Sequence, residues 1–103
     1  YTEQEKLQIA REHLLQRAAQ DTGWDINNII ISDDAILHII RQYTSEQGVR
    51  ELQREITAIL RRSLLQNDGM DVKTEFTIDK IDELLSVHKN ANMAAKIGFS
   101  ARI

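Results

Sequence analysis

The sequence predicts a small, mainly α fold in which four helices accompany two short strands that pair in parallel. Apolar residues recur at helical spacing along most of the 103 residues, and capping residues precede these runs. Two strand-like runs, 28–31 and 75–77, are separated by two of the predicted helices. Strands joined through helices in this way pair in parallel, and a sheet of two strands needs the helices packed against it to persist.

The first predicted helix begins at Thr2, the N-cap of a capping box that Glu5 completes, and runs to about Gln20. Gly23 ends this helix, and the only tryptophan of the chain, Trp24, follows directly. A tryptophan after a helix-ending glycine usually ties the turn to the core. We therefore predict a core role for Trp24 rather than stacking on a ligand.

The second predicted helix follows Ser32, an N-cap residue with two aspartates behind it, where carboxylates favour the positive end of the helix dipole. Its inner face is Ile36, Ile39, Ile40 and Tyr43. The segment 44–48 breaks the pattern, and the third predicted helix carries the apolar stripe Val49, Leu52, Ile56, Ile59, Leu60 and Leu64. The opposite face of this helix carries Arg50, Arg54, Arg61 and Arg62 among Glu51, Gln53 and Glu55.

The remaining chain contains one more short helix. Asn67-Asp68-Gly69 is a turn signal, and Thr77 can cap a helix whose apolar face is Ile78, Ile81, Leu84 and Leu85. The helical pattern fades from about residue 89, and apolar residues alternate with Gly98, Ser100 and Arg102 over 97–103, a period of two. The tail 89–103 is predicted to be a linker toward a following domain or a disordered tail.

Arg50 is the most informative residue of the third helix. It falls in the first turn, where the helix dipole disfavours a cation by a few tenths of a kcal/mol. One explanation is an external anion, because a helix start offers free N–H groups and a guanidinium matches the geometry of phosphate. The alternative is a solvated arginine or a local ion pair with Glu46.

Several classes of chemistry find no support in the sequence. There is no cysteine, no Gly-rich phosphate loop, no His-Glu-x-x-His pair and no Gly-x-Ser-x-Gly elbow, and the three histidines lie too far apart for a local metal site. The net charge of -3 argues against broad nucleic-acid binding. The longest apolar run, residues 29–31, is too short to span a membrane. This chain by itself is therefore predicted not to be catalytic.

Between Tyr43 and Arg54 a tyrosine, Gly-Val-Arg, a leucine and an arginine fall at fixed spacing. This pattern is the most specific part of a resemblance to the small α-helical subdomain of Lon-type ATP-dependent proteases, which covers residue 1 to about residue 85. The other matching segments are Tyr1-Thr2-Glu3, Glu5-Lys6-Leu7, Ile9-Ala10, His13-Leu14-Leu15, Ile31-Ser32-Asp33, Ala35-Ile36 and Ile39-Ile40-Arg41.

The resemblance implies the four-helix lid subdomain of an AAA+ ATPase module, over residues 1–88. It implies that Arg50 is the second sensor, which reaches the phosphates of ATP bound with Mg²⁺ on a larger subdomain, and that Val49 and Tyr1 line the adenine side. It further implies the larger AAA+ subdomain and a serine–lysine protease domain in the same chain, a homo-hexamer and unfolded protein substrates. Relatives occur in the bacterial cytoplasm and in the mitochondrial matrix, and the whole protein is expected to be an ATP-dependent serine endopeptidase.

The sequence departs from this family at two places. Gln16 follows His-Leu-Leu where the family usually has proline, and Leu85-Ser86-Val87 stands where a Leu-Gly-Val-like ending is common. Two other functions stay open at this point. One is a helical DNA-binding or interaction module that uses the face with Arg50, Arg54, Arg61 and Arg62, although the interleaved glutamates weaken it. The other is the lid of a different AAA+ ATPase.

Overall fold

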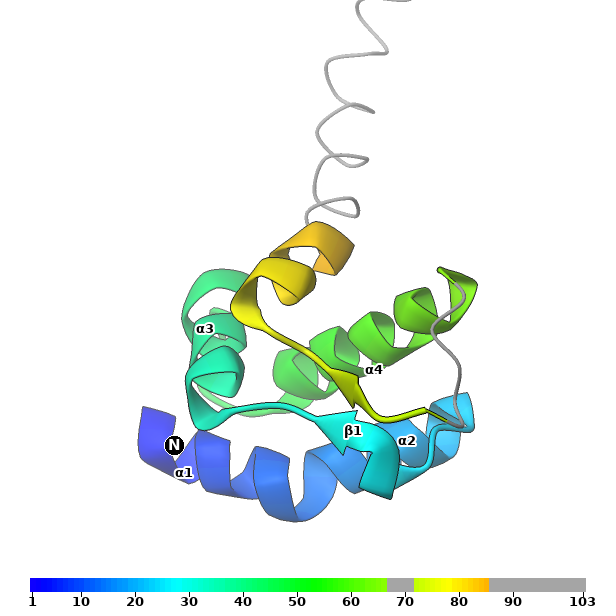
Figure 1. Ribbon diagram of the computed structural model, residues 1–103. Coiled ribbons are helices and arrows are strands. Elements are labelled where there is room, and N and C mark those ends of the chain that lie inside the picture. The colour runs from blue at the N-terminus through cyan, green and yellow to red at the C-terminus, as the bar shows by residue number, and fades with distance from the viewer. Residues whose placement is uncertain (67–71, 86–103) are drawn as a thin grey trace, which may run out of the picture.

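The computed structural model describes residues 1–66 and 72–85. Within these residues the fold is mainly α with one parallel two-stranded sheet, so the predicted fold class is confirmed (Figure 1). The predicted turn at Asn67-Asp68-Gly69 and the predicted tail 89–103 lie outside the described residues. The division of the chain into a lid, 1–88, and a linker, 89–103, therefore stays a prediction.

The chain opens with a long helical stretch made of α1 (Glu3–Ile9), η1 (Ala10–Leu14) and α2 (Leu15–Thr22). The predicted capping box is confirmed, because the Thr2 hydroxyl accepts the N–H of Glu5 at 3.1 Å and the Glu5 carboxylate accepts the N–H of Thr2 at 2.9 Å. The stretch runs two residues beyond the predicted end at Gln20 and includes Gln16.

A wide turn interrupts the regular winding of this stretch. In η1 the N–H of Leu15 donates to the carbonyl of Ala10, five residues back, which is the hydrogen bond of a π turn. The periodicity of the apolar residues did not predict this change, because their spacings of three and four residues also fit a regular α-helix. The Leu14 carbonyl in this turn accepts a hydrogen bond from Gln53 Nε2 at 3.2 Å, which ties η1 to α4.

The sheet is shorter than the sequence predicts. β1 is Ile29–Ile30 and β2 is Thr74–Glu75, paired in parallel with Ile29 opposite Thr74 and Ile30 opposite Glu75. The predicted start at residue 28 is wrong, because the Asp25 carboxylate accepts the N–H of Asn27 and closes a 3-10 turn, η2 (Ile26–Asn28). The second strand was predicted at 75–77. Phe76 instead follows β2 and donates its N–H to the Ile30 carbonyl at 2.7 Å.

The later helices begin at the predicted caps. α3 (Asp33–Tyr43) follows Ser32, whose hydroxyl accepts the N–H of Ala35 at 3.1 Å, and helical residues 78–85 follow Thr77, which accepts the N–H of Lys80 at 3.2 Å. Between them lies α4 (Arg50–Leu65). Among residues 1–66 and 72–85, no helix has both the length and the apolar composition that crossing a bilayer requires.

The core lies where these elements meet. α4 packs against α2, η1 and α3, and α3 also packs against α1. Figure 1 shows the opening helical stretch at one side of the molecule and residues 78–85 at the opposite side, with α4 and the strands between them. Trp24 is buried in the core as predicted, and its Nε1 donates to the Leu60 carbonyl at 2.9 Å. Besides Trp24, the largest apolar side chains that are almost completely buried are Phe76, Ile36, Ile39, Leu52, Ile56, Leu60, Ile81, Leu84 and Leu85.

An exposed ion pair fastens α1 to α3. Arg41 donates to both oxygens of Glu3, at distances of 2.9–3.2 Å. The hydrogen bond from Arg41 holds the pKa of Glu3 below its ordinary value of 4.5. Because the pKa is lower in the folded state, the pair stabilises the fold above pH 4.5 and this contribution is lost as the pH falls through the folded-state pKa.

We therefore expect Glu3→Gln to lower the thermal midpoint of unfolding slightly at neutral pH and low salt. The difference from the unmodified chain should vanish well below pH 4.5, where Glu3 is protonated in both states. Scanning calorimetry of both chains across this pH range checks the expectation. A difference that is the same at every pH would show that the charge of Glu3 contributes nothing.

Candidate functional site

Arg50 is the first residue of α4, as predicted, and its side chain is exposed. The N-cap, Val49, offers no side-chain hydrogen bond to the helix. Across residues 1–66 and 72–85, Arg50 has neither a hydrogen-bond partner nor an ion-pair partner. Its guanidinium is therefore available to a group from outside the described part of the chain.

Glu46 does not neutralise this arginine. Its carboxylate instead accepts the N–H of Glu51 and so caps the start of α4, while the carboxylate of Glu51 accepts the N–H of Ser45 at 3.4 Å. The local ion pair between Arg50 and Glu46 is not formed. Because the Glu46 carboxylate already accepts one N–H group of the first turn of α4, fewer free N–H groups remain there to bind an anion. An anion at this place would depend mainly on the guanidinium.

Val49 and Arg50 line a hollow between α2 and α4. The hollow has a volume of about 410 Å³ and is lined by Leu14, Arg17, Asp21, Val49, Arg50 and Gln53. Two guanidinium groups and one carboxylate border it, so the local balance of charge is positive. Such a border favours an anion, because arginine presents a planar fork of donors that matches phosphate or carboxylate oxygens.

The sequence reasoning missed three residues of this hollow, Arg17, Asp21 and Gln53. A signal was present, because Leu14, Arg17 and Asp21 share one face of a helix at spacings of three and four residues. Nothing in the sequence said that this face would lie beside the start of α4. Only the packing of α2 on α4 brings the two arginines to one hollow.

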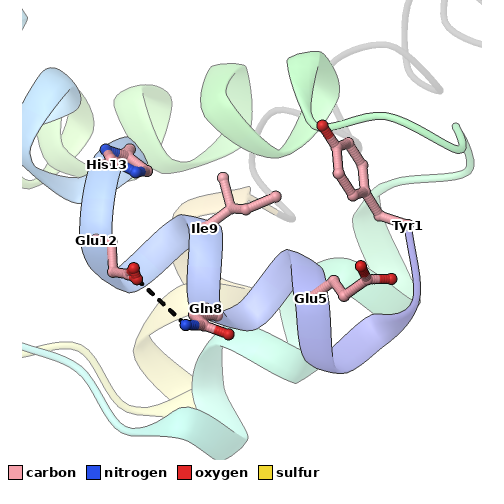
Figure 2. A pocket seen from close by; sticks show the side chains of 6 residues that line it. All are labelled: Tyr1, Glu5, Gln8, Ile9, Glu12 and His13. Carbon is pink, nitrogen blue, oxygen red and sulfur yellow. Dashed lines mark hydrogen bonds between the residues drawn. The ribbon is translucent and has the colours of Figure 1, made fainter.

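Tyr1 lies apart from Val49 and Arg50. It is 67% exposed and borders a second hollow, of about 230 Å³, together with Glu5, Gln8, Ile9, Glu12 and His13 (Figure 2). Figure 2 shows Tyr1, Ile9 and His13 projecting to the same side of the helix, while Gln8 and Glu12 are hydrogen bonded to each other at 3.3 Å. The two hollows are lined by consecutive residues, His13 and Leu14.

A backbone contact nevertheless brings Tyr1 to the segment that precedes Arg50. The backbone nitrogen of Tyr1 donates to the Gln47 carbonyl at 3.3 Å. The three residues predicted to face a nucleotide therefore lie on neighbouring parts of one surface, with Val49 and Arg50 in one hollow and Tyr1 in the next.

The sequence predicted that four arginines share one face of α4, and for Arg62 this prediction is wrong. At 100° per residue, Arg50, Arg54 and Arg61 lie within about 40° of one another around α4, whereas Arg62 lies outside this sector. Arg62 is half-buried, and its Nη1 donates to the Leu84 carbonyl at 2.8 Å, which fastens α4 to helical residues 78–85. The basic face therefore has three arginines, and Arg62 has a structural contact instead.

The described residues do not form a metal site. Within 1–66 and 72–85, no three side chains of histidine, aspartate or glutamate come together in a way that could hold a metal ion. His38 Nε2 and the Asp82 carboxylate form a pair at 2.7 Å. The Tyr43 hydroxyl donates to the same Asp82 oxygen at 2.8 Å, so these contacts connect α3 to helical residues 78–85. The candidate site of the described residues is the surface around Arg50.

The chain has relatives among known proteins. Residues 20–74 match the family described as the Lon protease AAA+ ATPase lid domain, which is more than half of the chain. The matched range includes all of α3 and α4 and the segment that carries Val49 and Arg50. The chain therefore belongs to the family of Lon protease AAA+ ATPase lid domains.

The curated relatives of this chain include Lon proteases of several bacteria. The chain is 45% identical over 93 residues to the Lon protease of Vibrio parahaemolyticus and 41% identical over 91 residues to Lon protease 1 of Syntrophobacter fumaroxidans, and each match covers 86% of this chain. The Lon protease of Bacillus thuringiensis is 49% identical over 63 residues, 61% of this chain. The matches span only 8–12% of the length of these relatives.

Proposed function

We propose that this chain is the lid of the ATPase module of a Lon-type ATP-dependent serine protease, and that Arg50 is its second sensor. In this role the guanidinium of Arg50 contacts the phosphates of ATP bound on a larger AAA+ subdomain of the same chain. The family match supports the lid assignment. The observation that carries the sensor role is that Arg50 opens α4, is exposed and lacks a partner among the described residues.

The physical chemistry of phosphoryl transfer explains why such an arginine matters. Negative charge is spread over the transferring phosphoryl group, and a positioned cation stabilises that charge in the transition state. The hydrogen-bonded cap of Glu46 on α4 fixes the place from which Arg50 extends.

The described residues fit a contact with phosphate and not a complete nucleotide site. Arg17 and Arg50 supply two cations around the hollow, while the phosphate loop and the ligands of Mg²⁺ would come from the larger subdomain. When bound there, ATP with Mg²⁺ would supply the phosphoryl group whose transfer to water drives the unfolding of protein substrates. Val49 borders the same hollow as Arg50, and Tyr1 borders the neighbouring one, on the side proposed for the adenine.

The proposal extends to the whole protein. Rotation of the lid between nucleotide states would couple ATP turnover to the unfolding of protein substrates, which a serine–lysine protease domain of the same chain then degrades. The assembly would be a homo-hexamer, located in the cytoplasm of a bacterium or in the mitochondrial matrix of a eukaryote.

The test compares two arginines of α4 in the full-length protein. We expect Arg50→Ala to lower kcat for ATP hydrolysis by on the order of a hundredfold, because a preorganised cation at the phosphates is lost. Degradation of an unfolded protein should fall with it. Arg54→Ala, one turn further along the same exposed face, should change kcat by less than about twofold, since a surface charge away from the reacting group contributes little.

Two results would contradict the proposal. Equal activity of Arg50→Ala and the unmodified protein would make Arg50 a solvated surface residue. Equal losses of DNA affinity in Arg50→Ala, Arg54→Ala and Arg61→Ala, with a steep dependence on salt and no change in ATP turnover, would favour the DNA-binding alternative.

A further inference from the structure

Lys6 is the only charged side chain that is buried among residues 1–66 and 72–85, with 8% of its surface exposed. Burial of an ammonium group costs free energy unless strong hydrogen bonds replace water, so a buried lysine needs a specific partner. The partner here is a backbone carbonyl. Lys6 Nζ donates to the Glu46 carbonyl at 2.6 Å, and within the described residues no carboxylate lies within ion-pair distance of Lys6.

The acceptor lies in the segment that carries Arg50. Segment 44–49 connects α3 to α4, and Glu46 is held there at two points. Its carbonyl accepts from Lys6, and its carboxylate accepts the N–H of Glu51 in the first turn of α4. A chain of hydrogen bonds therefore leads from the α1 helix through Glu46 to the turn that contains Arg50.

Close packing holds the end of this segment at Val49, which packs against the core, but it does not extend to Gly48. A Cβ atom at Gly48 would meet no atom within 4 Å, so the backbone at Gly48 is not pressed against a neighbour. Among the hydrogen bonds of residues 1–66 and 72–85, a longer one joins the Tyr1 nitrogen to the Gln47 carbonyl, at 3.3 Å. The short, charge-assisted hydrogen bond from Lys6 is thus the strongest tie between the segment and α1.

We propose that Lys6 is a positioning residue for Arg50. Its buried ammonium fixes segment 44–49 against α1 and thereby sets the place from which Arg50 reaches the phosphates. The inference rests on the proposed sensor role of Arg50. Its physical basis is that catalysis by a positioned cation falls steeply when the cation is displaced, even though the cation itself is still present.

The experiment is a double-mutant cycle in the full-length protein, with ATP hydrolysis as the readout. Lys6→Met keeps the length of the stem and removes the charge. We expect it to lower kcat by about tenfold, less than Arg50→Ala, because Arg50 is displaced rather than removed. In the Arg50→Ala background, Lys6→Met should lower kcat by less than about twofold, because both changes act on the same interaction.

Two control variants separate positioning from general stability. Lys6→Arg keeps a buried cation and should recover part of the lost kcat. Glu3→Gln weakens a different contact of α1, its ion pair with Arg41, and should leave kcat unchanged. If Lys6→Met does not assemble, Lys6→Gln, which keeps an N–H donor on a shorter stem, takes its place in the same cycle.

The outcomes are distinguishable. An unchanged kcat in Lys6→Met, or an equal loss in the presence and the absence of Arg50, would overturn the positioning role while leaving the sensor role intact. An unchanged kcat in Arg50→Ala would overturn the proposed function itself, and the positioning role with it. A loss in Lys6→Met that disappears in the Arg50→Ala background supports both.

Discussion

Phe76→Ala is expected to lower the free energy of unfolding by about 3–5 kcal/mol, because it removes a fully buried aromatic ring and leaves a cavity. Phe76 is 1% exposed and lies directly after β2. Its ring meets Trp24 edge to face, with ring centroids 5.8 Å apart. The substitution therefore removes contacts with the residue that ties the end of the first helical stretch to α4 through the Leu60 carbonyl.

Urea denaturation followed by fluorescence measures this loss directly, because Trp24 is the only tryptophan and lies against the altered residue. The matched control is Phe76→Leu, which keeps an apolar side chain and should cost less than half as much. A loss below about 1 kcal/mol for Phe76→Ala would mean that the site collapses around the smaller side chain and that Phe76 does not hold the sheet to the core.

Leu52→Ala is expected to lower the free energy of unfolding by about 2–4 kcal/mol, as deletions of buried leucine side chains do. Leu52 is 1% exposed and lies half a turn after Arg50, on the inner face of α4. Ile56→Ala, one turn further along the same buried stripe, should cost a similar amount. The loss reflects the packing of α4 against its neighbours, and not the site around Arg50.

The same helix offers a matched control in Leu65, which is 80% exposed at its other end. Leu65→Ala changes the same chemical group and should alter the free energy of unfolding by less than about 0.5 kcal/mol. Urea denaturation of the three alanine variants checks the comparison. Equal losses for Leu52→Ala and Leu65→Ala would indicate that helix propensity, and not burial, dominates the stability of α4.

Much of the fold could be predicted because its signals are local. Thr2, Ser32 and Thr77 cap helices through hydrogen bonds to residues three positions later, so a short stretch of sequence contains both partners. Gly23 adopts φ of 87°, a left-handed conformation that glycine reaches without strain. The limits of the strands were harder to predict, because a strand of two residues depends on its partner for its hydrogen bonds. In addition, Asn28 belongs to the 3-10 turn that Asp25 caps and not to β1.

The candidate site was predictable only in part. The position of Arg50 at a helix start follows from the local pattern of residues 48–56, and its proposed role comes from the family resemblance. Arg17 could not be assigned, because its approach to Arg50 depends on how α2 packs against α4. Likewise, the structural use of Arg62 depends on the Leu84 carbonyl, 22 residues away, which no helical periodicity reveals.

The sequence by itself determined the helices, the caps at Thr2, Ser32 and Thr77, and the placement of an arginine at the start of α4, since these depend on neighbours within a few positions. It also determined most of the buried faces, although Ile78, predicted on the inner face of the last helix, is 38% exposed. The tertiary structure decided which charged groups meet. In the folded chain the Glu46 carboxylate accepts the backbone N–H of Glu51 instead of pairing with the Arg50 guanidinium. Lys6 is buried against the Glu46 carbonyl, 40 positions away. These pairings follow from the free-energy cost of an unpaired buried polar group, which only the packed chain imposes.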